Sequence, residues 1–145
     1  MTITDNHSKS TIIPGLRYRD APAAIEWLCR VLGFEKHVVY SNPDGTIAHA
    51  ELTHGGGMVM LGSGKDDEQS RRFKSPDELD GIETGGAYVV VADADAAYAR
   101  AQAAGAQIAR QLQDTPYGCR EFAVKDPEGH TWGVGTYDPW TAPKS

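Results

Sequence analysis

Hydrophobic positions recur at helical spacing in two segments of the chain. In the first, apolar residues lie three and four positions apart between Asp20 and Gly33, and in the second an alanine-rich segment lies between Asp93 and Gly105. Aspartate is a favoured N-cap and glycine a favoured C-terminal stop. The pattern therefore predicts helices over residues 21–32 and about 94–104.

Each predicted helix is preceded by one run of strand character and followed by three. The runs cover residues 11–18, 34–41, 46–53 and 58–62 in the first half, and 87–92, 106–113, 119–125 and 130–136 in the second. Turn-forming residues separate consecutive runs, as in Asn42-Pro43-Asp44-Gly45. The chain is predicted to be α+β, with a β-α-β-β-β unit that occurs twice. The two copies are expected to bury each other's open faces.

The length of 145 residues is typical of a single domain, here residues 1–145, with 40% hydrophobic and 23% charged residues. Module one covers about 11–62, module two about 86–138, and residues 63–85 form a polar linker. The linker carries the cluster Arg71-Arg72-Phe73-Lys74, which is either a solvated loop or a lid over a ligand.

The net charge of −6, without a basic stripe, disfavours nucleic acid and anionic membranes as partners. The longest apolar runs are strand-sized, and Met1 to Thr11 lack the apolar stretch of a secretory signal. Cys29 and Cys119 have no zinc-type spacing, so they are interpreted as reduced thiols. A cytoplasmic protein without a membrane anchor is expected.

Several motifs resemble one known superfamily. They are Tyr18-Arg19-Asp20, Ala23-Ala24-Ile25-Glu26-Trp27, Leu32-Gly33-Phe34, and the run from Tyr117 to His130 that includes Gly118-Cys119-Arg120-Glu121-Phe122 and Asp126-Pro127-Glu128-Gly129. Over roughly residues 11–138 the chain resembles the vicinal-oxygen-chelate group of glyoxalase I, extradiol dioxygenases and bleomycin resistance proteins, and the last run is most similar to bleomycin resistance proteins. The resemblance implies two βαβββ modules that form a half-open barrel with a concave ligand cleft, often in a homodimer.

The metal enzymes of this superfamily carry their ligands on the first and last strands of each module. Counting from the helix caps and turn glycines places these positions at Ile13, Leu61, Ala87 and Gly133. None of these residues offers an imidazole, carboxylate or thiolate. Matching Glu51-Leu52-Thr53 to the Glu-Leu-Thr of glyoxalase I supplies one ligand at most. We therefore expect no metal, no cofactor and no catalytic residue.

Strand alternation then predicts which side chains face the concave side. The expected ligand contacts are Arg17, Tyr40, His49, Glu51, Leu61, Val89, Tyr117, Glu121 and Thr131. Tyr117 occupies the place that the resemblance gives to a ligand-stacking tryptophan, whereas Glu51 and Glu121 favour a cation. Residues of the opposite parity, such as Met60 and Val90, are expected to pack against the helices.

These features favour a non-enzymatic homodimer that sequesters an aromatic or cationic, antibiotic-like small molecule. The alternative is a metal-dependent lyase, isomerase or dioxygenase whose site has moved to His49, Glu51 and Glu121. A purely structural dimer is a third possibility. The residues do not identify the ligand or show whether any catalysis remains. They also do not distinguish a side-by-side dimer from a domain-swapped one.

Overall fold

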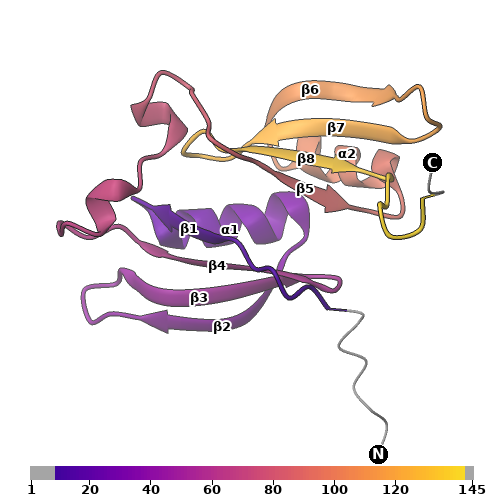
Figure 1. Cartoon of the computed structure of the whole chain (residues 1–145). Helices are drawn as coiled ribbons and strands as arrows, with labels where there is room; N and C mark the ends of the chain where they lie inside the picture. Colours follow the sequence, from indigo (N-terminus) through magenta and orange to yellow (C-terminus); the bar gives the residue numbers. More distant parts are fainter. Residues whose placement is uncertain (1–8, 143–145) are drawn as a thin grey trace, which may run out of the picture. The chain divides into compact units, whose positions relative to one another are not determined.

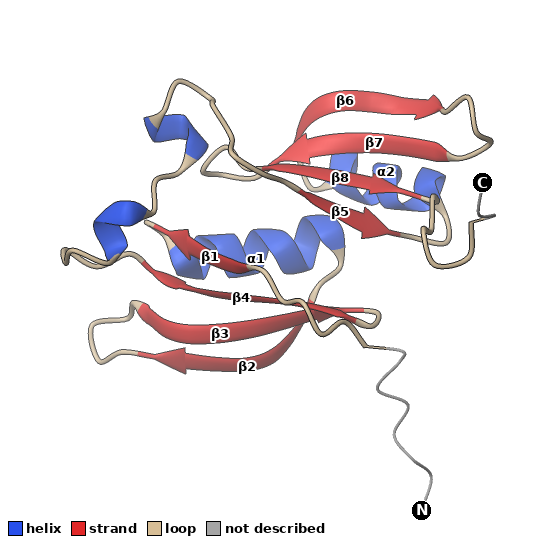
Figure 2. Ribbon diagram, viewed as in Figure 1, coloured by secondary structure: helices blue, strands red, loops and turns tan. Residues whose placement is uncertain are grey.

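The computed structural model describes residues 9–142, and the chain divides into two compact units (Figures 1 and 2). The first unit contains the strands β1 to β4 and continues to Ser75, and the second contains β5 to β8, from Pro76 onward, together with Arg30–Leu32. Each unit has one four-stranded sheet and one long helix. The predicted α+β class and the twofold β-α-β-β-β order are confirmed.

The first unit follows the predicted order closely. Its elements are β1 (Gly15–Tyr18), α1 (Ala21–Leu32), β2 (Glu35–Ser41), β3 (Ile47–His54) and β4 (Gly57–Ser63). The sheet has the order β1-β4-β3-β2, in which β1 runs parallel to β4 and the other pairs are antiparallel. A helix thus connects β1 to an antiparallel meander.

Helix α1 begins and ends as its sequence predicts. The Asp20 side chain accepts a hydrogen bond from the Ala23 backbone N–H at 3.1 Å, and Gly33 adopts a left-handed φ of 79°. An ion pair of 2.9 Å joins Lys36 of β2 to Glu26 of α1. Because Lys36 lies opposite the buried Leu52 in the ladder, α1 covers the sheet face that carries Leu52.

The second unit repeats this arrangement. Its elements are β5 (Ala87–Val90), α2 (Ala94–Ala103), β6 (Gln107–Asp114), β7 (Arg120–Lys125) and β8 (Thr131–Gly135), with the sheet order β5-β8-β7-β6. Asp93 caps α2 by accepting from the Ala96 N–H at 3.0 Å. The rings of Tyr98 and Phe122 meet edge to face at 5.0 Å, so α2 covers the Phe122 face, behind β7 and β8 in Figure 1.

The segment between the two sheets is irregular, with 3-10 turns at Ser70–Arg72 and Pro76–Glu78. Asp67 accepts a hydrogen bond from the Ser70 N–H at 2.7 Å, and this bond holds the pKa of Asp67 below its ordinary value. The Arg17 guanidinium lies over the Phe73 ring, 5.9 Å from its centroid. Part of the linker therefore folds onto the first sheet.

We call the face of each sheet opposite its helix the open face. In the first sheet Leu61 pairs with Ala50 and Val59 with Leu52, and all four side chains are buried on the helix side. The prediction that Leu61 faces the concave side is therefore wrong by one residue. Because side chains alternate along a strand, Met60 takes the open face instead.

The same one-residue error affects β5. Val89 pairs with the buried Val134 and is itself 7% exposed, whereas Val90 is 39% exposed. Val89 therefore packs in the core and Tyr88 and Val90 lie on the open face, the reverse of the prediction. The predicted faces of Arg17, His49, Glu51, Glu121 and Thr131 agree with the strand pairing. No helix in residues 9–142 has the length and apolar character needed to cross a membrane.

Candidate functional site

A polar cluster lies on the open face of the first sheet. The Nε2 atom of His49 is 2.8 Å from Oε2 of Glu51, and the rings of Tyr40 and His49 stack at 6.4 Å with an interplanar angle of 20°. His37, which the sequence did not single out, places its Nε2 atom 4.0 Å from Oε1 of Glu51. The structure thus brings together Tyr40, His49 and Glu51, three of the predicted ligand contacts.

Arg17 crosses the same open face from β1. A Cβ atom at Gly62, its partner on β4, would lie 2.7 Å from Nη1 of Arg17. The absence of a side chain at Gly62 therefore lets the guanidinium lie across the sheet toward Phe73. In this position Arg17 can donate hydrogen bonds to an acceptor on a ligand.

A second polar and aromatic group lies on the second unit. The rings of Tyr117 and Tyr137 meet edge to face at 5.4 Å, and the Tyr117 hydroxyl lies 3.5 Å from Oε2 of Glu121. The other carboxylate oxygen of Glu121 accepts from Arg110 at 3.3 Å. Tyr117 is 59% exposed, so its ring is accessible to a planar ligand.

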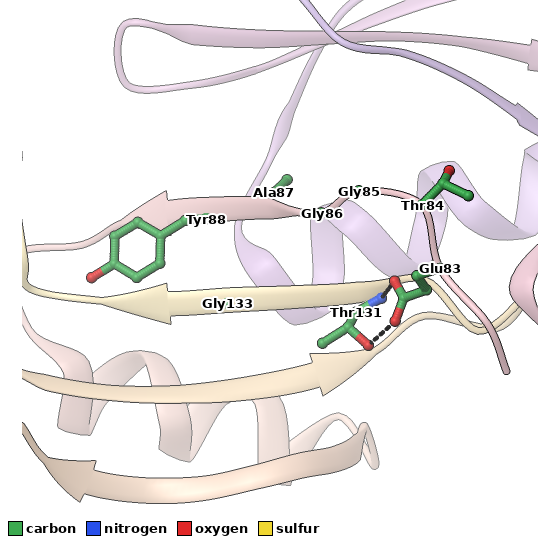
Figure 3. A pocket seen from close by; sticks show the side chains of 8 residues that line it. All are labelled: Glu83, Thr84, Gly85, Gly86, Ala87, Tyr88, Thr131 and Gly133. Atoms are coloured by element: carbon green, nitrogen blue, oxygen red, sulfur yellow. Dashed lines mark hydrogen bonds between the residues drawn. The ribbon is translucent and has the colours of Figure 1, made fainter.

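A pocket of about 630 Å³ opens at the start of β5 and β8 (Figure 3). Its lining residues are Glu83, Thr84, Gly85, Gly86, Ala87, Tyr88, Thr131 and Gly133. Thr131 is the one predicted ligand contact among them. Its backbone N–H and its hydroxyl donate to the two carboxylate oxygens of Glu83, at 2.7 and 2.6 Å. These bonds fix the carboxylate beside β8.

Tyr88 forms the other end of this pocket. Its ring lies along β8, because Cβ atoms at Gly133 and Gly135 would come within 3.2 Å of Tyr88 Cδ1 and 2.5 Å of its hydroxyl oxygen. The Tyr137 N–H donates to that oxygen at 3.0 Å. Burial raises the pKa of the Tyr88 phenol above its ordinary value, so the side chain is neutral at physiological pH.

The residues at the superfamily's metal positions do not fit a divalent ion. The Leu61 side chain is buried in the core, and the Tyr88 ring fills the space in which a side chain at position 133 would project. The open-face neighbours on those strands, Met60 and Tyr88, offer a thioether and a neutral phenol, which are poor ligands for a hard divalent ion. Within residues 9–142, no three His, Cys, Asp or Glu side chains form a metal-binding group, so His49, Glu51 and Glu121 do not assemble as one.

Sequence reasoning missed Glu83 and Tyr88. Glu83 lies in a segment interpreted as linker, yet it directly precedes Thr84-Gly85-Gly86, a glycine-rich approach to a strand. Tyr88 faces Gly133 and Gly135, and alternate glycines on a neighbouring strand are a signal that a large ring lies across them.

Comparison with known proteins gives a consistent result. The family model described as the Glyoxalase/Bleomycin resistance protein/Dioxygenase superfamily matches residues 10–134. An uncharacterised protein of Mycobacterium bovis is 32% identical over 122 residues, which cover 84% of this chain and 80% of that protein.

Among solved structures, TioX from Micromonospora sp. ML1 is 34% identical, with a TM-score of 0.67 over 87% of this chain and 97% of TioX. A domain from Frankia sp. EAN1pec described as glyoxylase/bleomycin resistance protein/dioxygenase is similar in fold, with 18% identity, a TM-score of 0.67, and coverage of 90% of this chain and 98% of that domain. A glyoxalase I mutant from Zea mays gives 18% identity and a TM-score of 0.68, over 90% of this chain and 46% of the maize chain. With a family model that matches most of its length, the chain belongs to the glyoxalase, bleomycin resistance protein and dioxygenase superfamily.

Proposed function

We propose that this protein binds an aromatic or cationic, antibiotic-like small molecule without a metal ion and acts by sequestering it. The open faces of the two sheets supply the contacts. The observation that carries the proposal is the chemistry of the family's metal positions. Ile13, Leu61, Ala87 and Gly133 provide no donor atoms, and the Tyr88 ring lies across Gly133.

The exposed residues suit binding by stacking and charge. The Tyr117 ring is exposed beside Glu121, and on the first sheet Tyr40 stacks on His49 beside Glu51. An aromatic contact contributes about 0.5 to 1.5 kcal/mol beyond the burial of area, and a cation above a ring contributes a similar amount. Such contacts support affinity for a planar cation while leaving its covalent structure unchanged.

The test combines thermal unfolding with metal analysis of the purified protein. Bleomycin and intercalating antibiotics are added to wild type and to Tyr117→Ala. A ligand present at about 100 times its Kd stabilises the folded state by about 2.7 kcal/mol, which raises the Tm by several degrees. We expect such a rise in wild type and a smaller one in Tyr117→Ala.

Two results would contradict this function. The first is a panel of antibiotics that leaves the Tm unchanged. The second is a stoichiometric divalent metal that disappears in His49→Ala, which would favour the lyase, isomerase or dioxygenase alternative.

We further propose that the protein is a cytoplasmic homodimer, in keeping with what the resemblance implies for many members. Light scattering coupled to size exclusion measures the mass directly. A mass of one chain at micromolar concentration would contradict the dimer.

A further inference from the structure

Glu83 is the one charged side chain among the residues that line the pocket of the second unit. Both of its carboxylate oxygens accept hydrogen bonds from Thr131, through the backbone N–H and the hydroxyl. Both donors are neutral. Within residues 9–142, no Lys, Arg or His nitrogen forms an ion pair with Glu83. Among the described residues, the Glu83 carboxylate is therefore oriented by Thr131 and has no counterion.

This arrangement differs from that of Glu121 and Glu51, which lie on the open faces of the sheets. Glu121 is paired with Arg110, and Glu51 lies between His37 and His49. A charge without a counterion favours any cation that reaches it, and a carboxylate already fixed by hydrogen bonds loses little conformational entropy on binding. The chain's net charge of −6 also favours the approach of a cation.

The rest of the pocket suits a flat group. Its wall from Thr84 to Gly86 contains two glycines, and a Cβ atom at Gly85 would contact nothing within 4 Å. At the far end lies the Tyr88 ring, which packs against the backbone of Gly133 (Figure 3). The pocket volume of about 630 Å³ is large enough for a planar ring between the carboxylate and the tyrosine.

We propose that this pocket binds an organic cation, an amidinium or ammonium group joined to a planar aromatic ring. The cation pairs with Glu83 and the ring lies against Tyr88. The inference rests on the proposed small-molecule binding function, and it names the class of ligand and the residue that selects it. Glu83 acts as the charge-selecting residue, and Thr131 positions it.

The experiment compares two probes of the same shape that differ in charge. The cationic probe is 2-naphthamidine and the neutral one is 2-naphthamide. Each is titrated into the full chain, with amide chemical shifts reporting the location and the Kd. We expect the amidine to shift the amides of residues 83–88 and 131–133, and to bind at least about tenfold more tightly than the amide, since a hydrogen bond between two charged groups is stronger than one between neutral groups.

Two substitutions separate charge from shape. Glu83→Gln keeps an acceptor for Thr131 but removes the charge, so amidine binding should weaken about tenfold or more, while amide binding is unchanged. Glu35→Gln, on the exposed strand β2, makes the same change in net charge and should leave both Kd values unchanged. Thr131→Val removes one of the two donors to Glu83 and should weaken amidine binding by a smaller factor while retaining the fold.

Three results would overturn the assignment. The two probes could bind equally, or neither could bind. The third is an amidine Kd that is the same in Glu83→Gln and Thr131→Val as in wild type. These results are distinct from failure of the proposed function. If antibiotics raise the Tm while naphthamidine does not bind, only the assignment of the cation pocket fails. If naphthamidine binds through Glu83 while no antibiotic raises the Tm, sequestration of antibiotics fails and the pocket stands.

Discussion

The two sheets have the same strand order, yet their open faces are built differently. In the first sheet Arg17 lies across Gly62 and reaches Phe73, whereas in the second Tyr88 lies across Gly133 and Gly135 and ends at the Tyr137 N–H. In both sheets a glycine on the last strand makes room for a long side chain from the parallel strand beside it. The scaffold thus fixes where a large group lies, and the residue at that position decides whether the face presents a cation or a neutral ring.

The charged groups differ in the same way. On the first sheet the carboxylate of Glu51 faces imidazoles, while in the second unit both oxygens of Glu83 accept from the neutral donors of Thr131. A repeated unit can therefore keep its hydrogen-bonded framework while a carboxylate lies beside imidazoles in one copy and beside neutral donors in the other.

The largest difference between the units is expected in how much free energy of unfolding is lost when an aspartate in a turn is replaced. Asp126 is 4% exposed and accepts hydrogen bonds from the Glu128 and His130 N–H groups at 3.0 Å and from Trp132 Nε1 at 3.1 Å. Asp126→Ala leaves these donors without that acceptor, so it should lower the free energy of unfolding by about 2 to 4 kcal/mol. Urea denaturation measures the loss.

The matched control is Asp44→Ala, in the exposed turn between β2 and β3, where the aspartate accepts from the Thr46 N–H at 2.9 Å. Its effect should be clearly smaller. Bonds to Thr46 lower the pKa of Asp44, so its contribution is present above the ordinary value of 3.8 and is lost as the pH falls through the lowered pKa. Equal losses in the two variants would show that burial does not distinguish the turns.

The glycines beneath the two long side chains provide the next test. A Cβ atom at Gly135 would lie 2.7 Å from Glu121 Cβ and 2.9 Å from the Arg120 carbonyl oxygen, and neither atom can move freely. Gly135→Ala should therefore destabilise the fold by about 2 to 3 kcal/mol. In Gly62→Ala the shortest contact is with the flexible end of Arg17, so a loss of about 1 kcal/mol is expected.

Gly15→Ala is the control for both, because its Cβ would contact nothing within 4 Å, and its effect should stay within about 0.5 kcal/mol. Thermal unfolding of the three variants gives the ranking. A Gly62→Ala loss as large as that of Gly135→Ala would mean that Arg17 or the Ala48 carbonyl oxygen, 3.1 Å from the new Cβ, cannot move aside.

The smallest effect is expected for Tyr88→Phe. The change removes the acceptor of the Tyr137 N–H and should lower the free energy of unfolding by about 1 kcal/mol. Because burial favours the neutral phenol, the ionisation of Tyr88 should move to higher pH, and the stability that the phenol contributes should be lost as the pH rises above about 10.

Absorbance at 295 nm during alkaline titration follows tyrosine ionisation, and Tyr88→Phe should lose amplitude in the part of the curve above the ordinary value of 10.0. Tyr40→Phe, at a residue that is 59% exposed on the first sheet, is the control and should leave stability unchanged. A high-pH amplitude in Tyr88→Phe equal to that of wild type would assign the raised pKa to another tyrosine.

The sequence was sufficient for the elements and insufficient for parts of the site. Caps such as Asp20 and Gly33 are local signals, so both helices begin where predicted and end within a residue of the prediction. The side of the sheet to which a strand residue points depends on the register of the strand, and a shift of one residue reverses it. Tyr18 and Val89 both lie an even number of positions before their helix caps and both are buried, whereas the prediction counted seven positions back in one module and six in the other.

The pocket was harder to predict because its two sides are distant in the chain. Glu83 meets Thr131 across 48 positions, and no local periodicity encodes that contact. Tyr117 and Glu121 lie four positions apart, which is why a motif could place them together.

The bond between Glu83 and Thr131 also has a consequence for the order in which the molecule is made. The segment from Glu83 to Tyr88 leaves the ribosome well before β8 is synthesised, so the first wall of the pocket exists while its partner strand does not. Joining residues 48 positions apart requires closure of a long loop, which makes this contact a late event in folding. Protection of the Thr131 amide from hydrogen exchange would then report that the last strand has joined its sheet, and the nascent chain would be unable to bind a cation in this pocket until that moment.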